Sequence, residues 1–485
     1  MKKILLSGAA LALLASAANA ADAPSKKKGP IAPPTPAWMD TLSIDGYVEG
    51  SVTVNPSQPY NGLNWGHLYS DRANTPTFNG LLTTIQRPLD PKATGFDYGF
   101  KIQTQLGADA RYNHYYGELD YLIHDRTQFA IIEAHALAHL PIITSGGVDV
   151  KVGQFATYNG FEVMPAKDNL LYSHTYMFNF GPFKHTGVMI TTHAYDWLDI
   201  YTGVTTGLNT SIGWPGDNNN SPSFHGGIGL NLLDGKLTIL GFTHAGPENA
   251  KQTDPLGVGW SNIPLACSCS VSSTWRYYNN LTTTYKPNDN LTLALDLSYM
   301  REDGWNGQSF TGLNPAQLAA FGGPFGAAPF NAPPFTKPTG ADAYGAAGYV
   351  SYKFNDLVKV TGRAEYFRDN KNFFVAAYPG YHDSVNAAHG FVSQTIFRPV
   401  NAFTGNNNGT SYLALTLGAT ITPDLPKIPY ISGLIIRPEL RWDVALNGSS
   451  PFFGPLATGF GGVGGTSRNT QGLAMVDVIV PFTIK

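Results

Sequence analysis

The stretch LIIRPELRWDV, from Leu434 to Val444, decides the fold class of this chain. Every second residue in it is apolar, and the positions between carry the alternating charges Arg437, Glu439, Arg441 and Asp443. Such charges cannot enter a dry core unpaired, and a row of apolar side chains is not usually left in water. A strand with lipid on one side and a watery lumen on the other satisfies both faces. The pattern therefore predicts a transmembrane β-strand.

Similar segments with a two-residue period recur along the chain, and they amount to about sixteen strands. Their approximate ranges are 42–54, 80–87, 97–109, 127–140, 147–157, 183–194, 197–208, 223–233, 236–246, 272–285, 291–301, 342–354, 357–370, 409–421, 431–444 and 470–483. Short connections such as 195–196, 234–235, 286–290 and 355–356 alternate with long ones at 56–78, 158–182, 302–341, 371–408 and 447–468.

This alternation is typical of bacterial outer-membrane barrels, which have an even number of strands, short periplasmic turns and long extracellular loops. The sequence therefore predicts an all-β fold over residues 41–485, namely a closed antiparallel transmembrane β-barrel of about 16 strands. A soluble β-sandwich would not need the repeated apolar bands that end in aromatic residues. A secreted β-helix would show a short fixed repeat, which the sequence lacks.

The N-terminus has the pattern of an export signal. Lys2 and Lys3 precede an apolar run that reaches about Leu14, and small residues follow up to Ala20. Residues 1–20 therefore read as a secretory signal peptide, and the Pro- and Lys-rich residues 21–40 as a periplasmic lead-in. Removing the signal leaves 29 basic against 34 acidic residues, a net charge of -5 that is too mild to indicate nucleic acid as a partner.

Several stretches resemble a known family. They are VKVGQFATYNGFEVMPAKDNLLYSHTYMFNFGPFKHTG from Val150, IDGYVEG from Ile44, GFDYGFKIQTQLGADARY from Gly95, RAEYFRDN from Arg363 and IRPELRWD from Ile436. Together they resemble the beta-barrel porin-2 (OmpL-like) family of bacterial outer-membrane porins. The resemblance implies a barrel in the cell outer membrane for passive solute passage. Outer-membrane barrels generally end on an aromatic residue that the barrel assembly machinery reads, whereas here Phe482 is followed by three further residues.

Motifs for catalysis or for a cofactor are absent from the sequence, since no P-loop, dinucleotide fingerprint, calcium loop or nucleophile elbow occurs. His135 and His139, with Glu133 nearby, would share a metal-binding face on a helix, but they also share one face of a strand. A polar stripe facing the lumen is the favoured interpretation, because a helix would break the barrel ladder. Cys267 and Cys269 predict a loop disulfide or free thiols, with a metal site as the rival.

The loop from Tyr158 to Pro182 is the candidate for narrowing the pore. It is the third loop on the outside, and in a sixteen-strand barrel the opposite wall lies near the thirteenth and fourteenth strands. If the loop folds inward, its acids would face bases on that wall and create a transverse field. The candidate constriction residues are Glu162, Lys167, Asp168, Lys359, Arg363, Glu365, Arg437, Glu439, Arg441 and Asp443. The alternatives are a loop that stays outside and charges that merely pair between neighbouring strands.

Taken together, the sequence predicts a porin without enzymatic activity, cofactor or bound metal, which lets small hydrophilic solutes diffuse through a water-filled channel. Its expected partners are outer-membrane lipid, the assembly machinery, the solutes and further copies in a homo-oligomer. The alternatives are a surface-binding or structural barrel with an occluded lumen, and an outer-membrane hydrolase whose serine and histidine are distant in sequence.

Overall fold

The computed structural model describes residues 41–91, 93–115, 118–119, 126–213, 217, 219–248, 275–303, 340–377, 409–456 and 465–485. The predicted signal peptide 1–20, the lead-in 21–40 and the cysteine pair Cys267 and Cys269 lie outside these residues.

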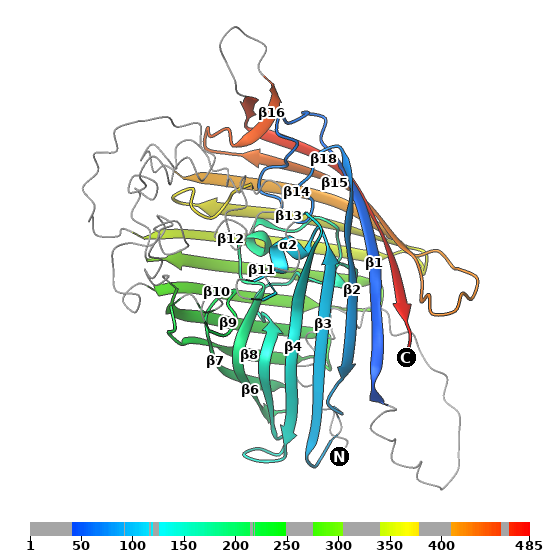
Figure 1. The fold of residues 1–485 in the computed structure, drawn as a ribbon, viewed down its shortest axis with the longest axis vertical. Helices are drawn as coiled ribbons and strands as arrows, with labels where there is room; N and C mark the ends of the chain where they lie inside the picture. The colour runs from blue at the N-terminus through cyan, green and yellow to red at the C-terminus, as the bar shows by residue number, and fades with distance from the viewer. Residues whose placement is uncertain are drawn as a thin grey trace.

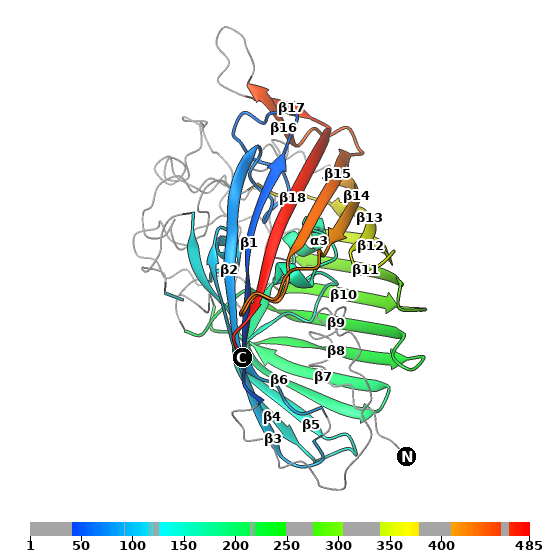
Figure 2. The same ribbon diagram turned by 90° about the vertical axis from the view of Figure 1, so that its right-hand side faces the viewer.

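Within the described residues, sixteen antiparallel strands form a closed barrel, in which each strand pairs with its neighbours in sequence and β18 pairs back with β1 (Figure 1, Figure 2). The strands are β1 Ser43–Val54, β2 Thr75–Arg87, β3 Asp97–Gly107, β4 Gln128–Leu140, β5 Val148–Ala156, β6 Lys184–Tyr195, β7 Leu198–Thr205, β8 Ser223–Leu232, β9 Leu237–Pro247, β10 Trp275–Tyr285, β11 Leu291–Glu302, β12 Ala341–Lys353, β13 Val358–Asp369, β14 Thr410–Ile421, β15 Ile435–Ala445 and β18 Thr470–Thr483. The prediction of a sixteen-strand antiparallel barrel is confirmed.

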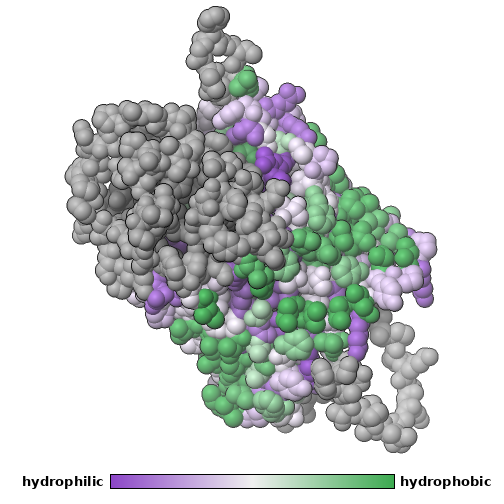
Figure 3. All heavy atoms as spheres, viewed as in Figure 1, coloured by the Kyte–Doolittle hydropathy of each residue, from purple (hydrophilic) through white to green (hydrophobic). Residues whose placement is uncertain are grey.

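The two-residue period sorts side chains between the two faces of the wall, as the sequence predicts. On β15, Leu440 and Trp442 are 61% and 54% exposed on the outside, whereas Arg441 and Asp443 are buried on the inside. Figure 3 shows hydrophobic residues covering much of the outer surface of the strands that face the viewer. The described residues contain no helix long and apolar enough to cross a membrane.

One strand begins earlier than its sequence pattern suggests. β2 starts at Thr75 rather than near residue 80, because its pairing with β1 continues beyond a bulge. At the bulge, Gly80 lies opposite Glu49 and Phe78 lies opposite Gly50. Asn79 is the extra residue of this bulge, and its amide points inward to donate to the Asp109 carboxylate. A bulge reverses the alternation, so a search for a strict two-residue period stops there.

The last long connection also differs from the prediction. β15 starts at Ile435 instead of residue 431, and the connection 447–468 contains a small hairpin of β16, Phe452–Leu456, and β17, Gly465–Arg468. These strands are only five and four residues long, so they carry no alternation from which the sequence could predict them.

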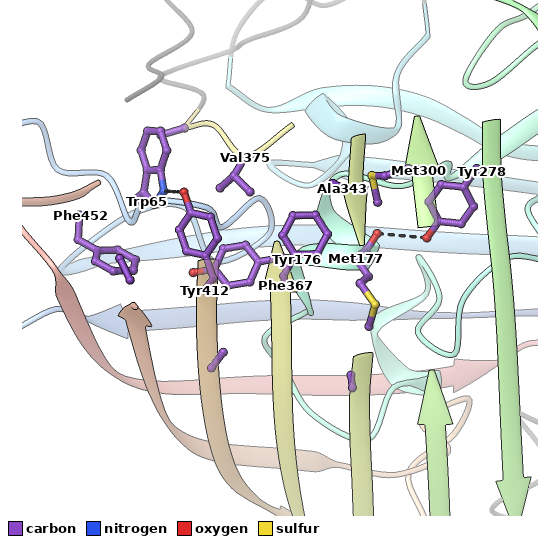
Figure 4. Packing of buried hydrophobic residues seen from close by; sticks show 14 of the residues in the cluster. Trp65, Tyr176, Met177, Tyr278, Met300, Ala343, Phe367, Val375, Tyr412 and Phe452 are labelled. Atoms are coloured by element: carbon purple, nitrogen blue, oxygen red, sulfur yellow. Dashed lines mark hydrogen bonds between the residues drawn. The ribbon is translucent and has the colours of Figure 1, made fainter. Parts of the chain in front are cut away.

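Loops fill much of the lumen toward the end of the barrel that carries the long connections, called here the loop end. The short helices α2, Ala110–Asn113, and α3, Tyr176–Asn179, lie inside the ring of strands (Figure 1, Figure 2). Figure 4 shows an aromatic cluster in which the Trp65 indole N–H donates to the Tyr412 hydroxyl at 3.3 Å. The rings of Tyr176 and Tyr412 lie 4.7 Å apart. The wall and two separate loops therefore share one apolar core inside the barrel.

Candidate functional site

Residues 157–183, between β5 and β6, form a segment that we call the inner loop. Its first turn is held by the lumen-facing side of β10 and β11, since the Gly160 N–H donates to Asn280 at 2.8 Å and the Phe161 N–H donates to Asp296 at 2.9 Å. Farther along, the Ala166 N–H donates to the Tyr47 hydroxyl on β1 at 2.8 Å. The inner loop therefore crosses the lumen rather than leaving the barrel.

Glu162 connects the inner loop to β13. Its Oε1 accepts from Arg363 Nη1 at 2.6 Å and from the Tyr349 hydroxyl at 3.1 Å, and its Oε2 accepts from the Thr175 N–H at 2.8 Å. Burial alone would raise the pKa of Glu162, but the Arg363 charge and these donors hold it below its usual range. Glu162 is therefore an ionised, fully bonded anchor for the loop.

Arg437 on β15 binds the main chain of the inner loop. Its Nη1 donates to the carbonyl oxygens of Ala166, Asn169 and Leu171 at 2.8, 2.9 and 3.2 Å. Its Nε donates to the Asp477 carboxylate on the adjacent strand β18 at 3.0 Å. The planar guanidinium carries several donors in fixed directions, so a single side chain can hold three carbonyls and a carboxylate together.

Two positions farther along the lumen face of β15, Glu439 holds the next part of the loop. Its carboxylate accepts from the Tyr172 N–H at 2.8 Å, from the Ser173 N–H at 3.2 Å and from the Ser173 hydroxyl. Glu365 on β13 accepts from the Met177 N–H at 3.3 Å. The wall therefore supplies acceptors for the loop N–H groups as well as donors for its carbonyls.

Arg441 and Asp443 complete this contact. Arg441 donates to the His174 carbonyl at 2.6 Å and, through Nε, to Asp443 at 2.9 Å. Asp443 in turn accepts from the Tyr176 hydroxyl of α3 at 3.1 Å. All of these groups are buried.

Seven of the ten predicted constriction residues come together, and we call them the anchoring network: Glu162, Arg363, Glu365, Arg437, Glu439, Arg441 and Asp443. The sequence predicts that, if the loop folds inward, its acids face bases on the wall and create a transverse field. In the structure these charges touch one another, because the loop is bonded directly to the wall and each arginine has a carboxylate beside it. These residues therefore hold the loop in place and are shielded from the lumen.

The other three predicted residues lie apart from the anchoring network. Lys359 is half-buried near the start of β13, opposite Lys353 and Thr420. Lys167 and Asp168 lie on the inner loop, where Lys167 Nζ is 3.4 Å from Asp168 Oδ1 and the two side chains are 28% and 15% exposed. Burial raises the pKa of Asp168, and the positive charge of Lys167 partly offsets this effect.

A second group of charges lies on β3, β4 and β5 and on the neighbouring turn of the inner loop. Lys101 Nζ, on a side chain that is 21% exposed, pairs with Glu133 Oε1 at 2.5 Å, and Lys151 donates to the Tyr158 hydroxyl at 2.8 Å. Asp168 also feels the field of Lys101. We call Lys101, Glu133, Lys151, Lys167 and Asp168 the charged face, because several of these side chains remain partly open to the lumen.

The histidines of β4 belong to a strand. The Ile132 bulge opposite the step from Gln103 to Thr104 sets the phase in which Glu133, His135 and His139 all face inward. His135 Nδ1 bonds to the Gln154 carbonyl at 3.1 Å, and His139 Nδ1 bonds to Asp149 at 2.7 Å. Both therefore line the wall in the way that a polar lumen stripe requires.

Sequence reasoning missed Asp477 and Tyr47 as supports of the inner loop. Asp477 lies opposite Arg437 in the register of β15 and β18, and the Tyr47 hydroxyl accepts from the loop main chain. The inward phase of both residues can be read from the alternation. Their partners depend on strand register and on the path of a loop, which no single strand pattern encodes.

Among solved structures with a similar fold is the anion-selective porin from Comamonas acidovorans, with a TM-score of 0.49, 9% sequence identity and coverage of 91% of this chain and 99% of that chain. Another is the outer membrane channel DcaP of Acinetobacter baumannii, with a TM-score of 0.45, 11% identity and coverage of 91% and 97%. OmpT of Vibrio cholerae has a TM-score of 0.46, 9% identity and coverage of 91% and 99%.

No curated protein matches the chain in sequence. The family model described as "Putative beta-barrel porin-2, OmpL-like" matches residues 41–482, which is nearly the whole described barrel. The resemblance that the sequence motifs predict is thereby confirmed, and the chain belongs to this family of outer-membrane β-barrel porins.

Proposed function

We propose that this outer-membrane porin lets small hydrophilic solutes diffuse passively past the charged face, and that it carries out no catalysis. Its membership of the porin family places it in the outer membrane as a channel. The proposal adds the route and the class of solute. It rests on the asymmetry of the inner loop, which is bonded to the wall on one side and carries partly exposed charges on the other.

The route follows from which of the paired charges remain exposed. Arg363 and Arg441 are each buried beside carboxylates and main-chain acceptors, so they present little field to a passing solute. Lys101 and Lys167 also lie beside carboxylates, but they keep 21% and 28% of their side chains exposed. We therefore assign contact with the solute to the charged face and mechanical support to the anchoring network.

The charged face carries both signs, and this composition suits small polar solutes better than one class of ion. Lys101, Lys151 and Lys167 bring positive charge, and Glu133 and Asp168 bring negative charge. Opposite charges that line a narrow passage orient dipolar molecules and compensate for part of their lost hydration. We therefore expect weak ion selectivity together with good permeability to neutral, hydroxyl-rich molecules.

The test is to record single-channel conductance of the purified protein in planar bilayers and to measure swelling of proteoliposomes in neutral sugars. Lys101→Ala with Lys151→Ala should move the reversal potential in a salt gradient toward cation preference, and Asp168→Asn should move it toward anion preference. Lys236→Ala, in an exposed short turn, is the matched control and should leave the reversal potential unchanged. Unchanged reversal potentials in a conducting barrel would show that the charged face does not contact the solute.

A barrel filled by its own loops is the competing function, and the aromatic cluster around Trp65, Tyr176 and Tyr412 favours it. Such a barrel would serve as a surface-binding or structural protein and would give no conductance steps. The same bilayer recording therefore separates the two functions. Hydrolysis of lipid or peptide substrates by the purified protein would contradict the proposal that the chain is not an enzyme.

The remaining proposed partners follow from the class of protein. Outer-membrane barrels are inserted by an assembly machinery, and we propose that it recognises the final strand through Phe482, which lies on the outward phase with Val478. We also propose association into a homo-oligomer, to be tested by chemical crosslinking of intact outer membranes.

A further inference from the structure

Three histidines come together inside the wall near the loop end of the barrel, apart from the charged face and the anchoring network. His185, His225 and His244 come from β6, β8 and β9, and each is 0% exposed. The ring centroids of His185 and His225 lie 4.0 Å apart, and those of His185 and His244 lie 5.3 Å apart. One nitrogen of each ring lies within 4.8 Å of the corresponding nitrogens of the other two.

His185 and His244 each present one nitrogen whose lone pair can bind a metal, and for His185 the metal would replace a hydrogen bond from the Thr157 hydroxyl. His185 Nδ1 lies 3.1 Å from the Gly207 carbonyl, which can only accept, so Nδ1 carries the proton and Nε2 carries the lone pair. His185 Nε2 accepts at 3.1 Å from the Thr157 hydroxyl. His244 Nε2 lies 3.0 Å from the Glu248 carboxylate, and among the described residues its Nδ1 has no partner.

His225 gives the strongest indication of a ligand. Both of its ring nitrogens are buried, and within the described part of the chain neither makes a hydrogen bond of good geometry, although the Thr243 backbone lies close to the ring. Buried polar atoms are nearly always satisfied, so an imidazole that lacks a good hydrogen bond and lies beside two others indicates a missing partner. A water molecule alone would need several polar partners of its own. A metal ion can take the three imidazole lone pairs as ligands and complete its coordination with one further ligand such as water.

We propose that His185, His225 and His244 bind a divalent transition-metal ion, with Zn2+ as the probe, which clasps the loop ends of β6, β8 and β9. Imidazole nitrogen is a preferred ligand for this class of ion, and Zn2+ holds such nitrogens at about 2.0–2.1 Å. The three nitrogens lie within 4.8 Å of one another, so metal binding would require the rings to rotate toward a common centre. The bonds to Gly207 and Glu248 match the usual arrangement, in which a ligating histidine donates its other N–H to a carbonyl or carboxylate.

A second group of metal-ligand type, His139, Asp149 and His193, provides the internal comparison. There the ring nitrogens meet carboxylates directly, at 2.7 Å for His139 with Asp149 and 3.2 Å for His193 with Asp149, and His193 also bonds Asp199 at 2.7 Å. Hydrogen bonds already account for that group, so it serves as a control.

The purified full-length barrel is stripped of metal with EDTA and then incubated with Zn2+. Bound metal is measured by mass spectrometry. The unfolding temperature is measured from the change in gel migration that accompanies unfolding on heating. A single Zn2+ per chain and a raised unfolding temperature are expected, and Co2+ should give the visible bands of a site with nitrogen ligands. Because the site is buried, the protein is also refolded with metal present. No bound metal under either condition would overturn the proposal.

His225→Phe keeps the stacked ring and removes a ligand, so it should weaken Zn2+ binding by at least about 100-fold, since even changes to groups that support ligands cost 10–100-fold. His185→Gln serves the same purpose if His225→Phe does not fold. His139→Gln, in the comparison group, should bind Zn2+ as the unchanged protein does. If His225→Phe binds Zn2+ with unchanged affinity, or if His139→Gln alone loses it, the three histidines are only neutral packing groups.

Discussion

Arg363 on β13 donates from Nη1 to Oε1 of Glu162 in the inner loop at 2.6 Å, although the two residues are 201 positions apart in sequence. The Arg363 side chain is fully buried, and that of Glu162 is 5% exposed. This pair connects the loop that leaves β5 to the opposite wall of the barrel. Its loss would remove one of the anchors of the loop without removing any strand pair.

Arg363→Ala should therefore destabilise the folded barrel. It should also make the open channel wider or less stable, which changes its single-channel conductance. Removing one partner of a buried ion pair typically costs about 3–5 kcal/mol, because the other charge stays buried and unpaired. Thermal unfolding and single-channel conductance measure the two effects. Lys359→Ala, on the same strand but outside the anchoring network, is the control. Equal behaviour of the two variants would show that the ion pair does not hold the loop.

Leu295→Arg tests the assignment of the outer face. Leu295 is 42% exposed on the outside of β11, whereas Thr292 lies on the inward phase of the same strand. An arginine on the lipid-facing side near the bilayer midplane should cost about 2–4 kcal/mol, and Thr292→Arg should have a mild effect. The free energies of unfolding of the two variants are compared by urea-induced unfolding in the presence of lipid vesicles. Similar losses for both variants would contradict the assignment.

The orientation of the barrel can be tested with epitope tags. A tag at Gly213, in the connection after β7 where the chain has open space around it, should bind antibody on intact cells. A tag at Asp234-Gly235 or at Asn355-Asp356, in short turns of the opposite end, should bind only after the outer membrane is permeabilised. Antibody binding to the Asn355 tag on intact cells would reverse the orientation.

Acidification should shift the channel toward anions through Asp168. Burial raises the pKa of this carboxyl, so it is protonated at a higher pH than an exposed aspartate and loses its negative charge earlier as the pH falls. The reversal potential in a salt gradient, followed during acidification, should therefore move toward anion preference. The reversal potential of Asp168→Asn should already lie closer to anion preference at neutral pH and should change less during acidification. An identical pH response in both proteins would assign the titration to another group.

The sequence predicts the barrel well, because lipid on one side and water on the other impose the same alternation on every strand. Leu440 and Arg441 show this directly, since they are neighbours in sequence and lie on opposite faces. The alternation fails where a bulge reverses the phase, at Asn79 in β2. It also fails for the β16 and β17 hairpin, which has no lipid face to constrain its sequence.

The candidate site is harder to predict from the sequence. The inward phase of Arg437 and its neighbours can be read from the alternation, but their partners cannot. The bond from Arg437 to the Ala166 carbonyl joins residues 271 positions apart, and carbonyl groups leave no trace in a sequence pattern. The three clustered histidines are likewise far apart in the chain, so only strand register brings His185 beside His225.

The contacts from Arg363, Arg437 and Arg441 to carbonyl oxygens of the inner loop have a consequence for how this family can diversify. A carbonyl oxygen is present whatever side chain accompanies it. The wall thus binds the main chain along the path of the loop, and much of this binding does not depend on the side chains of the loop. Residues on the open side, such as Lys167, can then be exchanged without loss of these contacts.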